Sequence, residues 1–191
     1  MKILYLMRHG QTLFNKLEKT QGACDSPLTA KGIEDAKATK QFFEENQMHF
    51  DHCFSSTQER ASDTLELVTD QPYQRLKGVK EWDFGIFEGE SETLLPKTYY
   101  TDGSYGDFFV EFGGESATEF QARVIKTLKE TMAQVSDDEN VLVVCHGAVM
   151  LMFMQSLFSM EKIANEISFH NCAVLKLIFD NDRFEFVEQV K

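Results

Sequence analysis

Apolar and polar residues alternate in blocks along this chain, and the blocks predict strands and helices in turn. Residues 1–7 and 141–145 are rich in large apolar side chains and are followed by polar residues, a pattern typical of buried strands. Shorter runs at 52–55 and 76–79 predict two further strands. Apolar residues at helical spacing lie between these runs, so the alternation predicts a layered α/β fold with a largely parallel sheet.

Capping residues and turn residues predict where the helices and the last two strands begin. Thr29 is expected to be the N-cap of a helix. Residues 56–59 (Ser-Thr-Gln-Glu) and 116–119 (Ser-Ala-Thr-Glu) have the capping-box pattern, so helices are expected to begin at both. The chain closes with strand-like segments at 173–179 and 184–190, which an Asp-Asn-Asp turn joins into a hairpin.

Length and composition are ordinary for a globular protein. The chain has 191 residues, of which 42% are hydrophobic, and we expect one domain over 1–191 with an insertion at about 88–114. The net charge of −12 disfavours binding to nucleic acid or to an anionic membrane. The first strand begins too early for a signal peptide and no run of about eighteen apolar residues occurs, so a cytoplasmic location is expected. The cysteines lack CxxC spacing and give poor support for zinc binding or disulfides.

Two of the predicted strands are each followed by a histidine and a glycine. The first is followed by Arg8, His9 and a glycine, and the run 141–145 by His146 and a glycine. Ligands bind at the carboxyl ends of strands in open α/β sheets, so both imidazoles are expected at one edge. A guanidinium suits phosphate oxygens, and Arg60 in a following helix adds a second one if it faces the same edge. The alternative is that these are polar strand ends and a surface arginine.

Short motifs from residue 3 to about 180 have the spacing of one known family. In chain order they are Arg8-His9-Gly10-Gln11-Thr12 with Asn15, residues 25–32 (DSPLTAKG), Ser55-Ser56 with Arg60-Ala61 and Thr64, Glu81 with Gly85 and Glu88-Gly89, Gly113-Gly114-Glu115-Ser116 with Arg123, and His146-Gly147. On these motifs the chain resembles the histidine phosphatase superfamily, in its phosphoglycerate-mutase-like branch of small cofactor-independent phosphatases. The resemblance implies a three-layer α/β/α sandwich with a mostly parallel sheet and a small aromatic-rich insertion.

The resemblance also implies roles for residues in these motifs. His9 would be the nucleophile that forms a phosphohistidine, and Glu81 would be the general acid toward the leaving oxygen and then the base for water. The residues expected to bind the phosphoryl group or substrate are Arg8, Asn15, Gln21, Gly22, Arg60, His146 and Gly147. Neither a metal nor a cofactor is implied. The expected partner is a small phosphorylated substrate, and a homodimer is left open.

Physical chemistry agrees with these roles. Two arginines and a protonated His146 imidazole can compensate the charge on the three equatorial phosphoryl oxygens. The arginines also disfavour protonation of His9, which must be neutral to attack. A carboxyl group near phosphate has a raised pKa, which suits Glu81 as a proton donor. Asp83 and Glu88 are nearby rivals for that role.

The sequence favours hydrolysis over phosphoryl exchange. A cofactor-dependent phosphoglycerate mutase must hold a second acidic group, yet residues 88–119 contain a single basic residue, Lys97, among several acidic ones. The expected activity is therefore that of a phosphomonoesterase on small phosphorylated metabolites, and the mutase reaction is the alternative. A catalytically weak regulator that binds phosphorylated ligands is a second alternative. The aromatic residues around the insertion either fill a small core or form a wall for apolar leaving groups.

Overall fold

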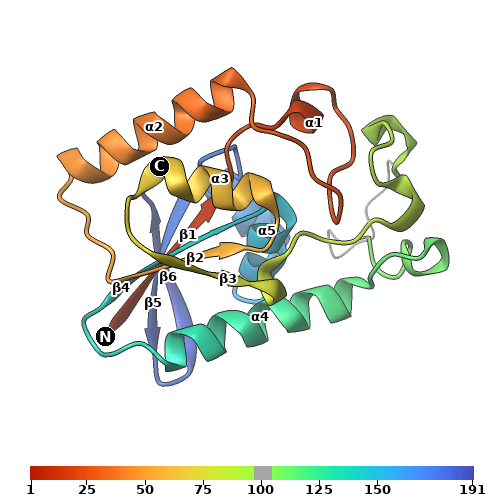
Figure 1. Ribbon diagram of the computed structural model, residues 1–191. Coiled ribbons are helices and arrows are strands. Elements are labelled where there is room, and N and C mark those ends of the chain that lie inside the picture. Colours follow the sequence, from red (N-terminus) through yellow and green to blue (C-terminus); the bar gives the residue numbers. More distant parts are fainter. Residues whose placement is uncertain (97–104) are drawn as a thin grey trace.

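A mixed β-sheet runs through the centre of the molecule (Figure 1). The computed structural model describes residues 1–96 and 105–191. Within these ranges six strands pair in the order β3-β2-β4-β1-β5-β6. Their bounds are β1 Lys2–Arg8, β2 His52–Ser56, β3 Tyr73–Leu76, β4 Asn140–Cys145, β5 Val174–Asp180 and β6 Arg183–Gln189. The two central strands, β1 and β4, are the two segments that the sequence pattern predicts as buried strands rich in large apolar side chains.

Strand pairing is parallel on one side of β1 and antiparallel on the other. β1 pairs in parallel with β4, β4 with β2, and β2 with β3. β5 is antiparallel to β1 and to β6. Asn181 and Asp182, both with positive φ, form the tight turn that joins β5 directly to β6. The predicted α/β fold with a mostly parallel sheet and a C-terminal hairpin is therefore confirmed.

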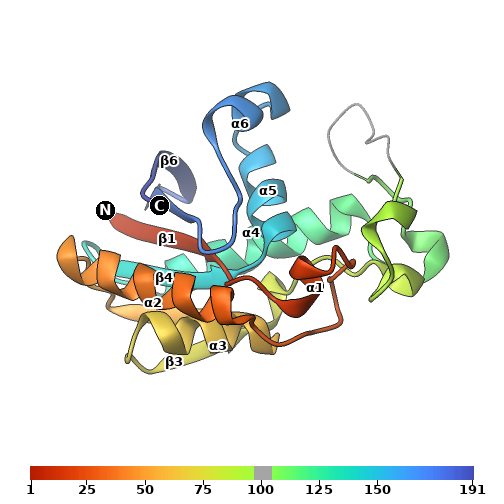
Figure 2. The same ribbon diagram turned by 90° about the horizontal axis from the view of Figure 1, so that it is seen from above.

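Helices cover both faces of the sheet, which gives three layers (Figures 1 and 2). They are α1 Leu13–Lys16, α2 Ala30–Glu45, α3 Glu59–Val68, α4 Ala117–Ala133, α5 Gly147–Gln155 and α6 Met160–Glu166, with 3₁₀ turns at Lys77–Val79, Gly85–Phe87, Glu92–Leu94 and Val110–Phe112. The helices α2 and α3 lie on one face, and α4 and α5 on the other. The hydroxyls of Thr29 and Ser116 cap α2 and α4, as predicted, by accepting hydrogen bonds from backbone amides at 3.0 and 3.1 Å.

Alternation along β1 divides its side chains between two hydrophobic cores. Leu4 and Leu6 pack with apolar residues of α4 and α5, whereas Tyr5 and Met7 pack with those of α2 and α3. All four side chains are buried. A strand that is apolar on both faces needs helices on both, so the pattern at the N-terminus accounts for the layered architecture.

The aromatic residues around the predicted insertion form a small core beside the sheet. Trp82 stacks on Phe120 of α4 with ring centroids 5.0 Å apart, and Phe84 meets Phe109 edge to face at 4.9 Å. All four rings are buried. These four rings therefore pack in a core, and Phe84 also lines a pocket, so the alternative of an aromatic wall stays a prediction. Two further aromatic residues of the insertion, within 97–104, lie outside the described residues.

Two predicted elements begin elsewhere than the sequence pattern indicates. Ser56 is not the N-cap of α3: it ends β2, and Gln58 stands at the N-cap position without a side-chain capping bond. The Ser56 hydroxyl accepts a hydrogen bond from the Gln58 amide at 3.2 Å, which closes a turn before the helix begins. The strand predicted at 76–79 was wrong. The strand lies at Tyr73–Leu76, because its partner β2 ends there, and Lys77–Val79 forms a 3₁₀ turn.

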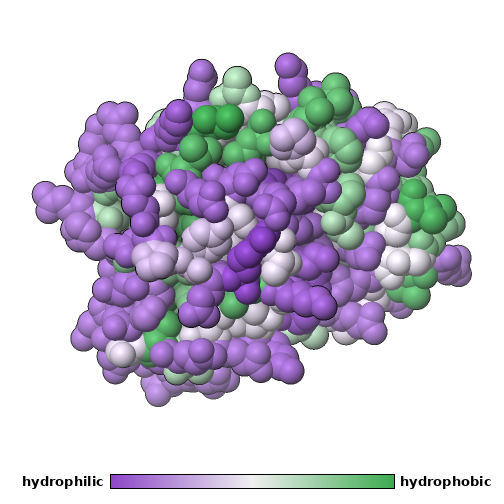
Figure 3. Space-filling view, viewed as in Figure 1, coloured by the Kyte–Doolittle hydropathy of each residue, from purple (hydrophilic) through white to green (hydrophobic). Residues whose placement is uncertain are grey.

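Hydrophilic side chains cover most of the face shown in Figure 3, in keeping with the net charge of −12. Hydrophobic side chains gather on this face toward the end that holds residues 85–96 and 105–115. None of the helices in the described ranges is long and apolar enough to cross a membrane. The cysteines at 24, 53, 145 and 172 are all described, and all are free thiols.

Candidate active site

The carboxyl ends of β1 and β4 bring His9 and His146 together. The two strands pair in register up to Arg8 and Cys145, and the His9 amide donates to the Cys145 carbonyl at 3.0 Å. The two imidazole rings meet edge to face with centroids 5.2 Å apart. The convergence that the two strand ends predict is therefore confirmed.

A backbone contact holds the His9 ring in one tautomer. Nδ1 of His9 lies 2.7 Å from the carbonyl oxygen of Gly10, and because a carbonyl can only accept, Nδ1 carries the proton. Nε2 of the neutral ring then carries the lone pair. Burial, followed by the charges of Arg60 and Arg8, holds the pKa of His9 well below its ordinary value. The sequence predicted the effect of the arginines but not the larger effect of burial.

Two further side chains fix the turn that carries His9. Thr64 of α3 accepts a hydrogen bond from the Gly10 amide at 2.9 Å and donates to the Arg60 carbonyl at 2.7 Å. Asn171 donates to the His9 carbonyl at 3.0 Å. Thr64 belongs to one of the sequence motifs. Sequence reasoning missed Asn171, because its partner is 162 positions away in the chain.

His146 is fully enclosed by the protein. It has no exposed surface, and neither ring nitrogen has a hydrogen-bond partner among the described residues. Burial, followed by the charge of Arg60, holds the pKa of His146 well below its ordinary value, and the charge of Arg8 acts in the same direction. The enclosure, which the sequence did not show, therefore acts against the protonated imidazole that the sequence predicts. A phosphoryl dianion beside the ring would favour the protonated form and raise the pKa of His146.

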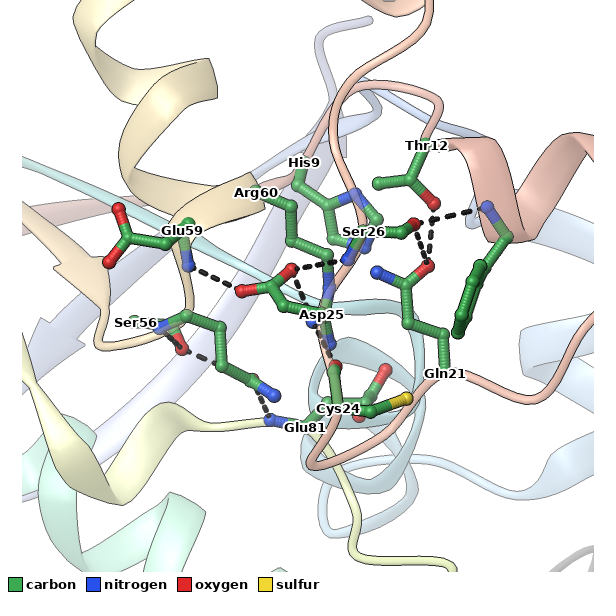
Figure 4. Close-up of polar contacts among 12 residues, drawn as sticks. His9, Thr12, Gln21, Cys24, Asp25, Ser26, Ser56, Glu59, Arg60 and Glu81 are labelled. Carbon is green, nitrogen blue, oxygen red and sulfur yellow. Dashed lines mark hydrogen bonds and ion pairs between the residues drawn. The ribbon is translucent and has the colours of Figure 1, made fainter. Parts of the chain in front are cut away.

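Arg60, in the first turn of α3, reaches the loop at 22–25 (Figure 4). Its Nη1 donates to the Cys24 carbonyl at 2.9 Å and to the Asp25 carboxylate at 3.0 Å. Its Nη2 donates to the Gly22 carbonyl at 3.0 Å. Only 1% of Arg60 is exposed, which excludes the alternative of a surface arginine. The loop thus fixes the plane of this guanidinium beside the two histidines.

Arg8 ends β1 and lies against the N-terminus of α5. Its Nη1 donates to the Phe169 carbonyl at 2.5 Å. A Cβ atom placed on Gly147, the first residue of α5, would lie 3.3 Å from the Arg8 guanidinium carbon. Burial lowers the pKa of Arg8, and the charge of Glu81 opposes that shift. The absence of a side chain at Gly147 therefore leaves room for the guanidinium.

Several buried polar atoms at this edge of the sheet have no hydrogen-bond partner in the part of the chain that the structure describes. They are Arg8 Nε, Thr20 Oγ1, Gln21 Nε2, Arg60 Nε and both ring nitrogens of His146. Buried polar groups nearly always have partners, so such a cluster indicates a polar ligand. Most of these atoms are N–H donors. The ligand that they fit is rich in acceptor oxygens, as a phosphoryl group is.

The Glu81 carboxylate is buried beside the start of α5. Its Oε1 accepts a hydrogen bond from the Trp82 amide at 3.0 Å, and its Oε2 accepts one from the Ala148 amide at 3.0 Å. Gln58 fixes the backbone by accepting from the Glu81 amide at 2.8 Å. Burial raises the pKa of Glu81, although the two hydrogen bonds and the arginines oppose the shift. A carboxyl group so placed is suited to hold a proton.

The rival carboxylates are engaged elsewhere. Glu88 accepts hydrogen bonds of 2.7–3.0 Å from several backbone amides. These amides belong to Gly22, Ala23, Cys24 and Phe84. Asp83 accepts from a backbone amide at 2.9 Å and lines a second cavity, which Glu81 also lines. Neither carboxylate lines the pocket that contains Arg8 and Glu81, and the sequence did not indicate the structural role of Glu88.

A pocket of about 450 Å³ opens onto this arrangement. The predicted residues that line it are Arg8, Asn15, Gln21, Glu81 and Gly147. His9, Arg60 and His146 are buried and do not line it. Gly22 does not line it either, since its amide donates to Glu88 and its carbonyl accepts from Arg60. No cluster of three or more histidine, cysteine or acidic side chains that could hold a metal ion occurs within residues 1–96 and 105–191.

Sequence comparisons connect this arrangement to known proteins. The model of the family described as histidine phosphatase superfamily (branch 1) matches residues 4–190. The broad-specificity phosphatase YOR283W of Saccharomyces cerevisiae is 28% identical over 96% of this chain and 82% of that protein. The 6-phosphofructo-2-kinase/fructose-2,6-bisphosphatase 3 of Bos taurus is 27% identical over 92% of this chain. The match spans only 38% of that longer protein.

Solved structures show the same fold. A phosphoglycerate mutase from Bacillus anthracis is 25% identical with a TM-score of 0.83, over 97% of this chain and 91% of that chain. A mutant phosphoserine phosphatase from Entamoeba histolytica, in complex with phosphoserine, is 27% identical with a TM-score of 0.81. That match covers 99% of this chain and 96% of the other. The phosphoglycerate-mutase-like fold that the motifs implied is confirmed.

Proposed function

Because this chain belongs to branch 1 of the histidine phosphatase superfamily, we propose that it hydrolyses small phosphorylated metabolites through a phosphohistidine on His9. In this proposal Arg8, Arg60 and His146 hold the phosphoryl group, and Glu81 moves the proton. The relatives include a broad-specificity phosphatase and a phosphoserine phosphatase, which supports a phosphomonoesterase of this kind.

The observation that carries the proposal is the set of unpartnered donors around a neutral imidazole. The His9 ring presents its lone pair on Nε2, because Nδ1 donates to the Gly10 carbonyl. Arg8 and Arg60 each keep an N–H without a partner, and so does at least one nitrogen of His146, among the residues that the structure describes. Phosphoryl transfer depends mainly on positioning and on stabilising the charge of three equatorial oxygens, which these groups supply.

In the first step, Nε2 of His9 attacks phosphorus and the bond from phosphorus to the leaving oxygen breaks. Glu81 gives its proton to that oxygen, so the alcohol leaves in neutral form and Glu81 becomes a carboxylate. The attacking ring gains positive charge, and the Gly10 carbonyl stabilises it by accepting the hydrogen bond from Nδ1. The raised pKa of Glu81 keeps its proton available for this transfer.

In the second step, water attacks the phosphohistidine. The Glu81 carboxylate takes a proton from the water as the oxygen–phosphorus bond forms and the phosphorus–nitrogen bond breaks. Inorganic phosphate leaves, His9 returns to its neutral form, and Glu81 is protonated again. The same carboxyl group thus acts as acid and then as base.

Phosphoryl exchange of the mutase type is the alternative that the likeness to the B. anthracis phosphoglycerate mutase supports. It requires a second anionic group to bind near the first. The pocket lining instead includes Glu92, with Glu18 close enough to raise the pKa of Glu92. Lys19 lines the same pocket and attracts a second anion, but the Glu92 carboxylate offsets that charge, which favours transfer to water.

The test of the proposed function is phosphate release from p-nitrophenyl phosphate by the wild-type protein and by His9→Ala. We expect the substitution to lower kcat by roughly a thousandfold or more, because it removes the nucleophile. Rapid quenching after ³²P-labelled substrate should trap an acid-labile phosphoprotein in the wild type alone. Equal rates for the two proteins would remove His9 from the mechanism, and binding without release would support the regulatory alternative.

A further inference from the structure

The pocket lining includes two charged side chains that the proposed hydrolysis does not use. Lys19 and Glu92 both line the pocket that contains Arg8 and Glu81. Within the described ranges neither forms an ion pair or a side-chain hydrogen bond. Charged groups beside a binding pocket that have neither an ion-pair partner nor a hydrogen-bond partner in the protein are candidates for contact with a ligand.

Backbone pairing fixes the position of these two residues. The Glu92 amide donates to the Glu18 carbonyl at 2.9 Å, and the Thr20 amide donates to the Glu90 carbonyl at 2.8 Å. Lys19 forms an isolated antiparallel bridge with Ser91. The two chain segments therefore form a short ladder that holds both charges at the pocket, and we call Lys19 and Glu92 the rim pair.

The two members of the rim pair have different surroundings. The Lys19 ammonium lies 5.5 Å from the centroid of the Phe14 ring, and the residue is half-buried. Partial burial and the charge of Glu18 raise the pKa of Glu92, whereas Arg8 lowers it. A cation bound at Glu92 would offset both effects that raise its pKa.

We propose that the rim pair selects the leaving group of the substrate. The favoured substrate is a phosphomonoester whose alcohol carries an ammonium group for Glu92 and a carboxylate for Lys19, as a phosphorylated hydroxy-amino acid does. This inference rests on the proposed function, because it concerns the leaving group of that reaction. A phosphoglycerate carries the carboxylate without the ammonium, so it leaves Glu92 unpaired beside a second anion.

The first test compares hydrolysis of matched substrates. They are phosphoserine with both groups, phosphoethanolamine with the ammonium, 3-phosphoglycerate with the carboxylate, and p-nitrophenyl phosphate with neither. We expect Glu92→Gln to lower kcat/KM about tenfold for the two ammonium-bearing substrates, since it removes one charge-assisted hydrogen bond, and not to lower kcat/KM for p-nitrophenyl phosphate. Lys19→Met should lower kcat/KM about tenfold for the two carboxylate-bearing substrates.

Glu90→Gln is the matched control. Glu90 lies two residues before Glu92 and is exposed as Glu92 is, but it does not line the pocket, so this variant should match the wild type with every substrate. Equal kcat/KM of the wild type for phosphoserine and 3-phosphoglycerate would overturn the inference. An equal loss of kcat/KM for all four substrates in Glu92→Gln would overturn it as well.

A binding measurement separates failure of this inference from failure of the proposed function. Calorimetry with the His9→Ala protein reports affinity without turnover. We expect phosphoserine to bind about tenfold more tightly than 3-phosphoglycerate, and Glu92→Gln to remove that difference. If p-nitrophenyl phosphate is not hydrolysed at all, the proposed function fails, while equal affinities would overturn the role of the rim pair alone.

Discussion

At the scale of single residues, Glu81 shows how burial and hydrogen bonding act against each other on one carboxyl group. Amides of Trp82 and Ala148 favour its ionised form, yet enclosure has the larger effect and raises its pKa. The group is therefore oriented as an acceptor at both oxygens and still able to keep a proton. That combination suits a residue that must give a proton and take one back in each cycle.

Glu81→Gln should reduce hydrolysis in a way that depends on the leaving group. A glutamine keeps the size of the side chain but cannot donate the proton, so kcat for an alkyl phosphate should fall by about 10²–10⁴-fold. p-Nitrophenolate leaves well without protonation, and its first step should be affected far less. Single-turnover measurement of the first step with both substrates checks this. Equal losses would indicate that Glu81 acts on something other than the leaving oxygen.

A substitution of the pocket residue Gly147 should lower activity without lowering stability. In Gly147→Ala the new Cβ would lie 3.3 Å from the Arg8 guanidinium carbon, so the guanidinium must shift by a few tenths of an ångström. Alanine is the better helix former, so α5 should not be weakened. We expect kcat/KM to fall several-fold while the urea midpoint stays unchanged or rises. Unchanged kcat/KM would show that the position of Arg8 is not critical.

At the scale of elements, the loop at 22–25 connects the buried arginine to the rest of the site. Its carbonyls at Gly22 and Cys24 accept from Arg60, and its amides donate to Glu88. One carboxylate thereby organises a turn that would otherwise leave several amides unpaired. Glu88 is a positioning residue in this interpretation, since it acts on Arg60 through the loop.

Glu88→Gln should therefore weaken both the fold and the site. A glutamine has one acceptor oxygen where the carboxylate has two, and its NH₂ group would face backbone donors. We expect the free energy of unfolding in urea to fall by about 1–3 kcal/mol, and kcat/KM to fall for every phosphomonoester alike. The exposed Glu90→Gln serves as the control for loss of one negative charge. A purely structural role would lower stability without changing kcat/KM at temperatures where the variant is folded.

The elements that the sequence predicted correctly are those whose signals are local. The apolar runs of β1 and β4, the caps at Thr29 and Ser116, and the C-terminal turn each depend on neighbouring residues. The capping box at 56–59 failed because sheet pairing holds Ser56 in β2, and pairing is not local information. Sequence motifs and resemblance also indicated which residues would meet at the sheet edge.

What the sequence could not show is burial and long-range hydrogen bonding. The complete enclosure of His146, which lowers the pKa of the ring and acts against its predicted protonation, depends on several elements packing around it. The carboxylate of Glu88 was a rival acid in the motif and is an acceptor for backbone amides in the structure. Both outcomes depend on contacts between segments that are far apart in the chain. The spacing of residues within a motif carries no information about such contacts.

At the scale of the whole molecule, the buried histidines make folding stability depend on pH. His9 and His146 have folded pKa values well below the ordinary value of about 6.5, which the unfolded chain has. Between these values the unfolded state binds more protons, so the free energy of unfolding falls as the pH drops below about 6.5. Each histidine contributes a slope of up to about 1.4 kcal/mol per pH unit. Glu81 affects stability in the opposite direction because its folded pKa is raised. Its contribution to the free energy of unfolding is lost as the pH rises from about 4.5, the ordinary pKa of glutamate, through the folded pKa.

Urea unfolding at about pH 7.5, 6.5 and 5.5 should therefore show the wild type losing stability over this range. His146→Gln removes one of the two titrating groups and should lower the slope by about half, whatever it does to the stability at pH 7.5. A wild-type free energy of unfolding that does not change over this range would contradict two buried, neutral imidazoles. The site that we propose for phosphoryl transfer would then need a different protonation state at its centre.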